Sequence, residues 1–202
     1  MPETSPKKYE FCAREHEAGR KKQAILPKKT RRVVTDIWPV LMRHEQGLVE
    51  KAWLRVCEEE VIKRVIGIGP HSQPSDCAAL QSVMNSTEEL LHRLILSLNI
   101  STTAFVDSCQ ELGARHVRLA RRGFKVDHID LLKNALIDVF DDAMSKRGRN
   151  DSEKHHMRVF IECICQNMKY GFMDEDKAKV SCYEELSRLP DVPAVRENDD
   201  GD

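Results

Sequence analysis

Apolar side chains recur every three or four residues along most of this chain, and this spacing constrains its fold more than any other feature. Alternating runs rich in valine and isoleucine, which would indicate strands, do not occur. We therefore expect an all-α domain rather than a sandwich or a barrel. The expected helices cover about residues 31–45, 47–66, 76–98, 102–119, 127–146 and 153–172, with a candidate last short helix in AKVSCYEEL (178–186).

Some helix boundaries are marked by local signals. Pro39 lacks a backbone donor and predicts a kink or a restart inside the first helix. The stretch GIGPHSQPSD (67–76) is rich in turn formers and predicts a loop. Asp76 is a candidate N-cap for the helix that follows, while a capping box from Ser86 to Glu89 leaves a later start open.

The two ends of the chain differ in charge from each other and from the middle. Residues 1–30 are strongly basic and residues 181–202 are acidic, and both lack helical periodicity. We interpret them as a basic N-terminal extension and an acidic C-terminal tail on either side of one domain, 31–180. The net charge of −1 gives no global field for nucleic acid, so none is expected as a partner.

The sequence also bears on the cellular compartment. No secretory signal, no myristoylation glycine and no run of about 18 apolar residues is evident, so we expect a cytoplasmic protein without a transmembrane segment. The seven cysteines are an odd number, which favours reduced thiols. Cys163 and Cys165 form a C-x-C with no second pair nearby, so a zinc site is not expected there.

One histidine lies on an otherwise apolar stripe. His116 follows Phe105, Cys109 and Leu112 at helical spacing. A neutral imidazole on such a face needs partners for both ring nitrogens. Spacing alone leaves two interpretations open, a core histidine bonded to a carbonyl or a metal ligand, and it favours the first.

The run LGARHVRLARRGFKVDHIDLLKNAL (112–136) resembles the globin family. The motif residues are Leu112, Gly113, His116, Gly123 and Phe124. Further likenesses are the tryptophan of the first helix, LLHRLILSLN (90–99) and RVFIECICQNMKYGF (158–172). The resemblance covers about residues 31–172 and implies a globin fold of six to eight helices packed around a haem pocket.

The resemblance implies haem b as the cofactor and His116 as the proximal ligand of its iron. The other ring nitrogen would donate to a carbonyl one turn back, near Leu112, which fixes the tautomer. Trp38 matches the family's first-helix tryptophan. The residues expected to line the haem pocket are Ile66, Leu112, Phe124, Ile129 and Leu132.

The distal side departs from the family pattern. Two alignments place the distal residue at Val83 or at Thr87, and neither is the usual His or Gln. Val83 donates nothing to a bound ligand, whereas Thr87 offers one hydroxyl that also can bond back to its own helix. His92 falls off the buried face of this helix. The usual corner phenylalanine is missing, with Ile66 among the nearest candidates.

Near the proximal histidine, His128 and the cations Arg115, Arg121, Arg122 and Lys125 are either propionate partners or a solvated face.

The resemblance implies a haem protein that binds oxygen or another diatomic gas such as NO or CO. With Val83 in the distal site, oxygen would be weakly held and the iron easily oxidised, which favours sensing, redox or electron transfer over bulk oxygen storage. Any haem-based redox activity would need a reductase or another protein partner, and no dedicated enzyme motif is present. A monomer and a homodimer both stay open. The alternative is a haem-free globin-fold interaction or regulatory domain.

Overall fold

The computed structural model describes residues 22–69, 72–98 and 100–187, and throughout these ranges the regular structure is helical. The all-α class is therefore confirmed. The helices are α1 (Lys28–His44), α2 (Leu48–Val56), α3 (Glu60–Ile66), α4 (Ala78–Ser97), α5 (Thr102–His116), α6 (His128–Lys146) and α7 (Asp151–Ser187), with 3-10 turns η1 (Pro74–Asp76) and η2 (Val117–Arg122).

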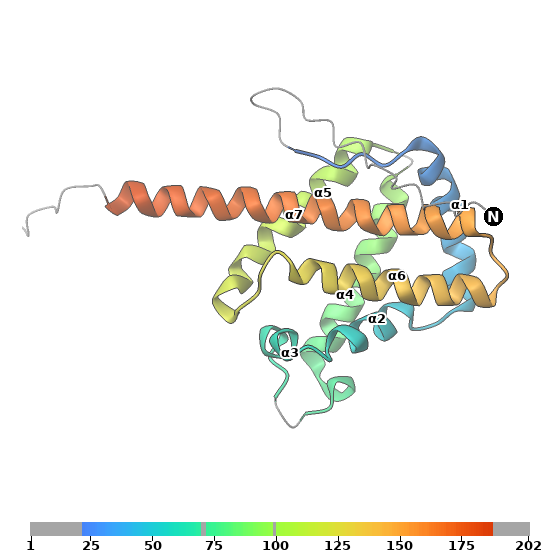
Figure 1. Ribbon diagram of the computed structural model, residues 1–202, viewed down its shortest axis with the longest axis horizontal. Coiled ribbons are helices and arrows are strands. Elements are labelled where there is room, and N and C mark those ends of the chain that lie inside the picture. Colours follow the sequence, from blue (N-terminus) through green and yellow to red (C-terminus); the bar gives the residue numbers. More distant parts are fainter. Residues whose placement is uncertain (1–21, 70–71, 99, 188–202) are drawn as a thin grey trace, which may run out of the picture.

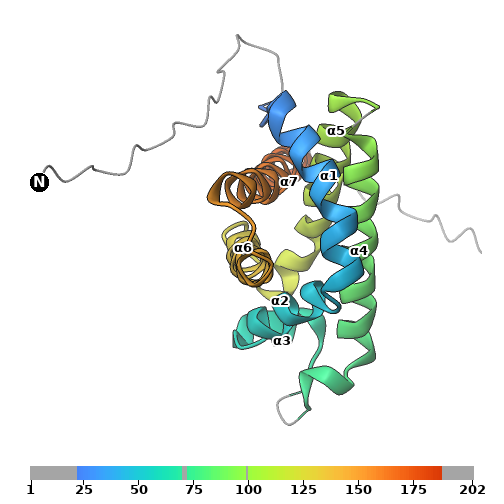
Figure 2. The same cartoon turned by 90° about the vertical axis from the view of Figure 1, so that its right-hand side faces the viewer.

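The helices form two crossing layers. α6 and α7 lie side by side, and α1, α4 and α5 cross behind them (Figure 1). Seen from the side, α6 and α7 point toward the viewer while α4 runs almost vertically, with α2 and α3 closing one end (Figure 2). α2 packs on α6 and on α4, and α1 packs on α7. The interface between the layers holds the apolar core, including the fully buried rings of Phe105, Phe140 and Phe160.

Helix ends follow from a few residues with special backbone or capping roles. Gly47 has φ +69° at the start of α2, and Gly123 has φ +92° after η2, a conformation that favours glycine. Ser101 caps α5, because its hydroxyl accepts a hydrogen bond from the backbone N–H of Ala104 at 3.2 Å. The cap at Ser101 places the start of α5 at Thr102.

Several helix bounds differ from the sequence-based expectation. The single helix expected over 47–66 is two helices, α2 and α3, and the helix expected to continue to 119 tightens into η2 after His116. The sixth helix and the short helix expected after it form one continuous α7, which extends past residue 180. Pro39 lies inside α1, whose helical assignment continues through it to His44.

Residues 22–27 were expected to belong to the basic extension, but they pack against the body of the molecule. Ala24 and Leu26 are buried, and α1 begins at Lys28, before the expected start at residue 31. The part of the extension at residues 1–21 lies outside the described residues. Within the described ranges, no helix has the length and apolar character needed to span a bilayer.

Candidate functional site

The site is built on α5, which rests on α7 at a close helix crossing. A Cβ at Gly113 would overlap the backbone of Met168, and a Cβ at Gly171 would overlap the backbone of Gln110. Only glycine permits backbones to approach this closely. The crossing therefore fixes α5 on α7 less than one helical turn before His116.

The imidazole of His116 is anchored on one side and open on the other. Its Nδ1 lies 2.7 Å from the carbonyl oxygen of Leu112. A carbonyl only accepts, so Nδ1 carries the proton and Nε2 of the neutral ring presents its lone pair. Among the described residues Nε2 has no hydrogen-bond partner, and it is not sealed from solvent. This is the tautomer that a metal-binding imidazole requires.

The surroundings of His116 favour the neutral ring. Burial lowers the pKa of His116 below its ordinary value. The hydrogen bond to Leu112 opposes this shift, and the nearby cations Arg118 and Arg115 add to it. The ring is therefore uncharged at neutral pH, with Nε2 available as a ligand.

The ring of Phe124 packs beside the imidazole of His116 and contacts two further rings. The centroid of Phe124 lies 5.6 Å from that of His116, and Phe172 of α7 lies 6.1 Å from Phe124. His128 meets Phe124 edge-on at 5.5 Å, and its Nδ1 accepts a hydrogen bond from the backbone N–H of Lys125 at 3.0 Å. His116 and Phe124, two residues expected in the site, are thus in contact, and His128 completes a small aromatic group beside them.

The expected distal residues form a closed pair on α4. Thr87 donates its hydroxyl proton to the carbonyl of Val83 at 2.8 Å and accepts a hydrogen bond from the indole N–H of Trp53 at 3.0 Å. The back-bond to Val83 is the alternative role considered for Thr87. No hydrogen bond or ring contact between this pair and His116 is found in the described ranges.

The indole of Trp53 is a feature that the sequence analysis missed. Trp53 lies on α2, so the hydrogen bond to Thr87 ties α2 to α4. Spacing within one helix cannot indicate which side chain of another helix Trp53 meets. A tryptophan on a half-polar stripe is a signal for such a partner, because a partly buried indole N–H needs an acceptor.

The expected pocket-lining residues belong to the core or to its margin. Ile129 is buried, and the half-buried ones that pack against the core cluster are Ile66, Leu112, Phe124 and Leu132.

Two of the cations expected near the site have protein partners. Arg122 donates to the carbonyl of Val65 at 3.1 Å, which ties η2 to the end of α3. Arg115 pairs with Glu111 on the exposed face of α5 at 3.0 Å. Arg121 and Lys125 are exposed.

His92 is exposed on α4 and takes part in a different contact. The buried indole of Trp38 donates to Nδ1 of His92 at 2.9 Å, and the same indole stacks on Phe140 with centroids 5.7 Å apart. His92 lies off the buried face of α4, as expected, and its bond to Trp38 was not predicted from the sequence.

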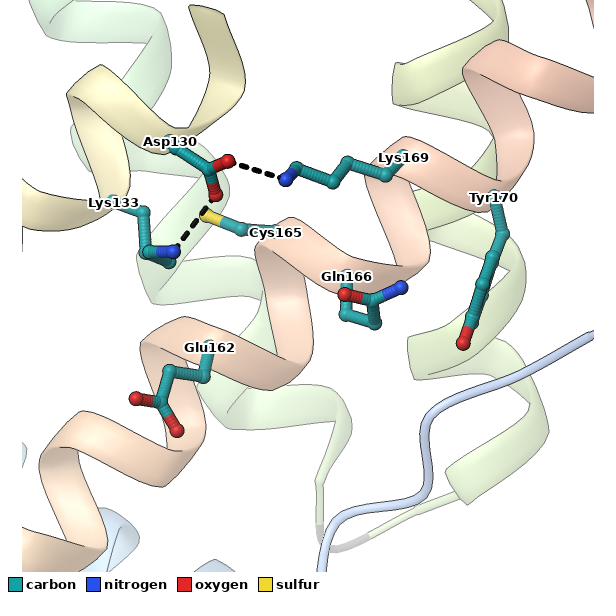
Figure 3. Close-up of a pocket in the computed structure, with 7 residues that line it drawn as sticks. All are labelled: Asp130, Lys133, Glu162, Cys165, Gln166, Lys169 and Tyr170. Atoms are coloured by element: carbon teal, nitrogen blue, oxygen red, sulfur yellow. Dashed lines mark hydrogen bonds and ion pairs between the residues drawn. The ribbon is translucent and has the colours of Figure 1, made fainter. Parts of the chain in front are cut away.

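A separate pocket of about 440 Å³ lies between α6 and α7 (Figure 3). Burial raises the pKa of Asp130, but hydrogen bonds from Lys133 and Lys169 outweigh this effect and hold that pKa below its usual range. Burial raises the pKa of Cys165 to about 12, so this thiol is protonated and unreactive at neutral pH. None of the expected site residues lines this pocket. The lining residues are Asp130, Lys133, Glu162, Cys165, Gln166, Lys169 and Tyr170.

Metal-binding side chains do not cluster in the described part of the chain. No group of three or more His, Cys, Asp or Glu residues there converges on one point. Burial raises the pKa of Cys163 to about 12 and that of Cys109 well above its ordinary value. Within the described residues, His116 therefore does not belong to a cluster of three or more such side chains.

No family model and no curated relative supplies a function that could be carried over to this chain. No family model matches the chain, and no curated protein matches it.

Proposed function

We propose that this chain is a haem-binding protein of globin type that binds oxygen or another diatomic gas at the iron. The observation that carries the proposal is the state of His116: Nδ1 donates to Leu112, the ring is neutral, and Nε2 is unpaired and open. Because Nε2 is open to solvent, water can pair with it in the absence of a ligand, and a ligand can take the place of that water. Within the described structure, His116 has a protein partner at Nδ1 alone.

The residues around His116 fit haem. When bound, haem would supply an iron centre with an open coordination position for a gas molecule. Phe124 offers apolar ring surface beside the imidazole, Phe172 packs on Phe124, and the carbonyl of Leu112 orients the imidazole. An all-helical fold with α4 and α5 neighbouring each other accords with a pocket between two helices.

The hydroxyl of Thr87 is already hydrogen-bonded on both sides, and this bears on the role of the iron. With its proton on Val83 and its lone pair on Trp53, Thr87 has no proton for a bound ligand, and Val83 has none to give. Oxygen bound without a hydrogen-bond donor is held weakly, and the iron is easily oxidised. We therefore propose a role in sensing, redox chemistry or electron transfer rather than bulk oxygen storage.

One observation favours the alternative, a haem-free interaction or regulatory domain of the same fold. The hydrogen bond between Trp53 and Thr87 closes α2 onto α4 at the expected distal positions. An indole held there would compete with haem for space.

Reconstitution with haem separates the two proposals. The wild-type protein is expected to bind one haem and show a Soret band, and His116→Ala should lose the five-coordinate or six-coordinate histidine spectrum. His128→Ala is the matched control, because His128 also contacts Phe124 but has its Nδ1 occupied by the N–H of Lys125. A wild-type protein that takes up no haem would support the haem-free domain. A spectrum unchanged in His116→Ala would overturn the ligand assignment.

A further inference from the structure

A short N-terminal segment lies across the junction of α5 and α7. We call residues 22–26 the strap. Asn167 of α7 accepts a hydrogen bond from the backbone N–H of Ala24 at 2.9 Å, and its amide N–H groups donate to the carbonyls of Ala24 at 2.9 Å and Cys163 at 3.0 Å. Asn167 is fully buried. A buried amide bonded on both sides to one residue fixes the register of the strap on α7.

The strap has a second anchor on the other helix. The side-chain amide of Gln110 on α5 donates to the carbonyl of Lys22 at 2.8 Å. Leu26, at the end of the strap, is almost completely buried in the core. The strap thus bonds to both helices of the junction, where it runs beside α7 (Figure 1).

The helices beneath the strap touch through their backbones. Gly113 faces the backbone of Met168, and Gly171 faces the backbone of Gln110. No side chain between them can adjust, so any change in the spacing moves α5 as a rigid body. Gln110 belongs to both sets of contacts, because its backbone meets Gly171 and its side chain holds the strap.

Movement of α5 would displace His116. His116 follows Gly113 by three positions on the same helix, so the imidazole moves with the crossing. A ligand displaced by about 1 Å loses most of the advantage of being preorganised. The position of the crossing therefore sets whether Nε2 lies where a ligand bond needs it.

We propose that Gln110 and Asn167 are positioning residues for His116, which act through the strap and the α5–α7 crossing, so that docking of the strap and ligation at His116 stabilise each other. The proposal rests on the proposed haem function for the identity of the ligand. Its core, the mechanical link from strap to imidazole, concerns the protein alone. Coupling of two sites is reciprocal, so a change at the strap should alter ligation at His116, and ligation at His116 should alter docking of the strap.

The first test changes a contact of the strap and measures the effect at His116. In full-length protein loaded with haem, Gln110→Ala is expected to shift and broaden the iron–histidine stretching band and to speed haem loss by about tenfold. Gln166→Ala is the matched control: it is the same substitution on α7, at a half-buried amide with no hydrogen bond among the described residues. A band and a loss rate equal to those of the control would overturn the proposal.

The second test changes ligation at His116 and measures docking of the strap. The amide of Ala24 is hydrogen-bonded to Asn167, and its hydrogen exchange reports docking of the strap. In wild-type protein, haem is expected to slow this exchange by about tenfold, and His116→Ala should abolish the effect. Equal exchange with and without haem would contradict the coupling.

A third measurement needs no haem and separates this proposal from the proposed function. Looser seating of α5 in Gln110→Ala or Asn167→Ala should let water reach His116 and raise the pKa of its imidazole, as followed by NMR of the apoprotein. Gln110 is half-buried, so its variant is expected to fold even where Asn167→Ala does not. If the wild-type protein binds no haem but the pKa of His116 rises in Gln110→Ala, the proposed haem function is wrong and the positioning role stands. A pKa identical in wild type and Gln110→Ala would overturn the positioning role.

Discussion

The hydroxyl of Thr87 forms two hydrogen bonds, and these decide what the side chains expected on the distal side can do. Its proton is donated to Val83 and its lone pair accepts from Trp53. Sequence alignment left Val83 and Thr87 as alternative distal residues, but they are partners in one hydrogen bond. The indole N–H of Trp53 is the donor in that second bond, so it too is occupied.

Thr87→Val removes the hydroxyl and leaves the indole N–H of Trp53 without its partner. We expect a loss of about 1 kcal/mol in the free energy of unfolding, measured with urea, since one partly buried hydrogen bond is lost. Thr35→Val is the matched control, because Thr35 bonds back to the carbonyl of Arg31 at 2.8 Å with no indole attached. Equal losses in the two variants would show that the bond from Trp53 contributes nothing.

The lowered pKa of His116 predicts how the apoprotein responds to acid. A folded-state pKa below the ordinary value of 6.5 means that the unfolded chain binds the proton more readily. The contribution of His116 to stability is therefore complete above that value and is lost as the pH falls below it. The expected result is a free energy of unfolding that decreases from about pH 7.5 to about pH 5.

His116→Gln should flatten this pH dependence. His156 also has a pKa lowered by burial, with Lys29 and His155 nearby, but it is present in both proteins and so cancels. Urea unfolding at several pH values gives the comparison. A slope that is the same in both proteins would mean that His116 does not titrate below its ordinary value.

Sequence reasoning reached part of the candidate site. The motif around His116 predicted a hydrogen bond to a carbonyl near Leu112, and that bond is present because a helix places the carbonyl of residue i−4 beside the side chain. The bond from Trp53 to Thr87 was not predicted, because it joins two helices and depends on how they cross. Haem ligation by His116 stays a prediction.

At the scale of elements, glycines at the crossing of α5 and α7 let the backbones of the two helices lie in direct contact. Gly113 belongs to the motif that drew attention to His116, and its role here is to admit the backbone of Met168. Gly171 lies within a helix, where glycine is unfavourable by roughly 0.5–1 kcal/mol relative to alanine. A glycine at such a position indicates close packing, and this signal was available in the sequence.

Gly171→Ala should therefore destabilise the protein although alanine favours helices. The added methyl group overlaps the backbone of Gln110, so we expect a loss of about 3 kcal/mol in the free energy of unfolding. Gly148→Ala is the control: its neighbourhood is open, and its φ of +64° costs about 1 kcal/mol for a non-glycine residue. A stabilised Gly171→Ala variant would show that the helices can separate without strain.

Helix bounds were predictable where local signals exist and not where packing decides. The start of α5 has a serine cap, and the sequence places it correctly at residue 102. The break between α2 and α3 has no proline or glycine at residues 57–59, and the apolar stripe continues across it, so it was missed. The continuous α7 was expected as two helices because its polar stretch after Phe172 has little periodicity.

At the scale of the whole molecule, two layers of helices bury one core, and the all-α class follows from periodicity alone. Periodicity identifies the buried face of each helix but not the helix that covers it. The pairing of helices could therefore not be derived from periodicity. The placement of α1 against α7 and of α2 against α6 depends on chain reversals at the corners between helices.

Haem binding should stabilise the whole fold if the proposed function holds. Free haem at about 100 times its dissociation constant adds about 2.7 kcal/mol, which corresponds to a rise of about 5–10 °C in Tm. Calorimetry or circular dichroism at several haem concentrations measures the shift, which should grow with concentration. His116→Ala should show a much smaller rise, and equal rises would indicate binding elsewhere on the protein.

The strap also bears on the order in which the molecule can fold. Ala24 and Asn167 are separated by 143 residues, so the strap cannot dock until nearly the whole domain has been synthesised. Until α7 leaves the ribosome, Leu26 lacks part of the surface that buries it. Closure of the α5–α7 junction is thus a late event in synthesis, and chains that stop before α7 expose an apolar N-terminal segment that chaperones recognise.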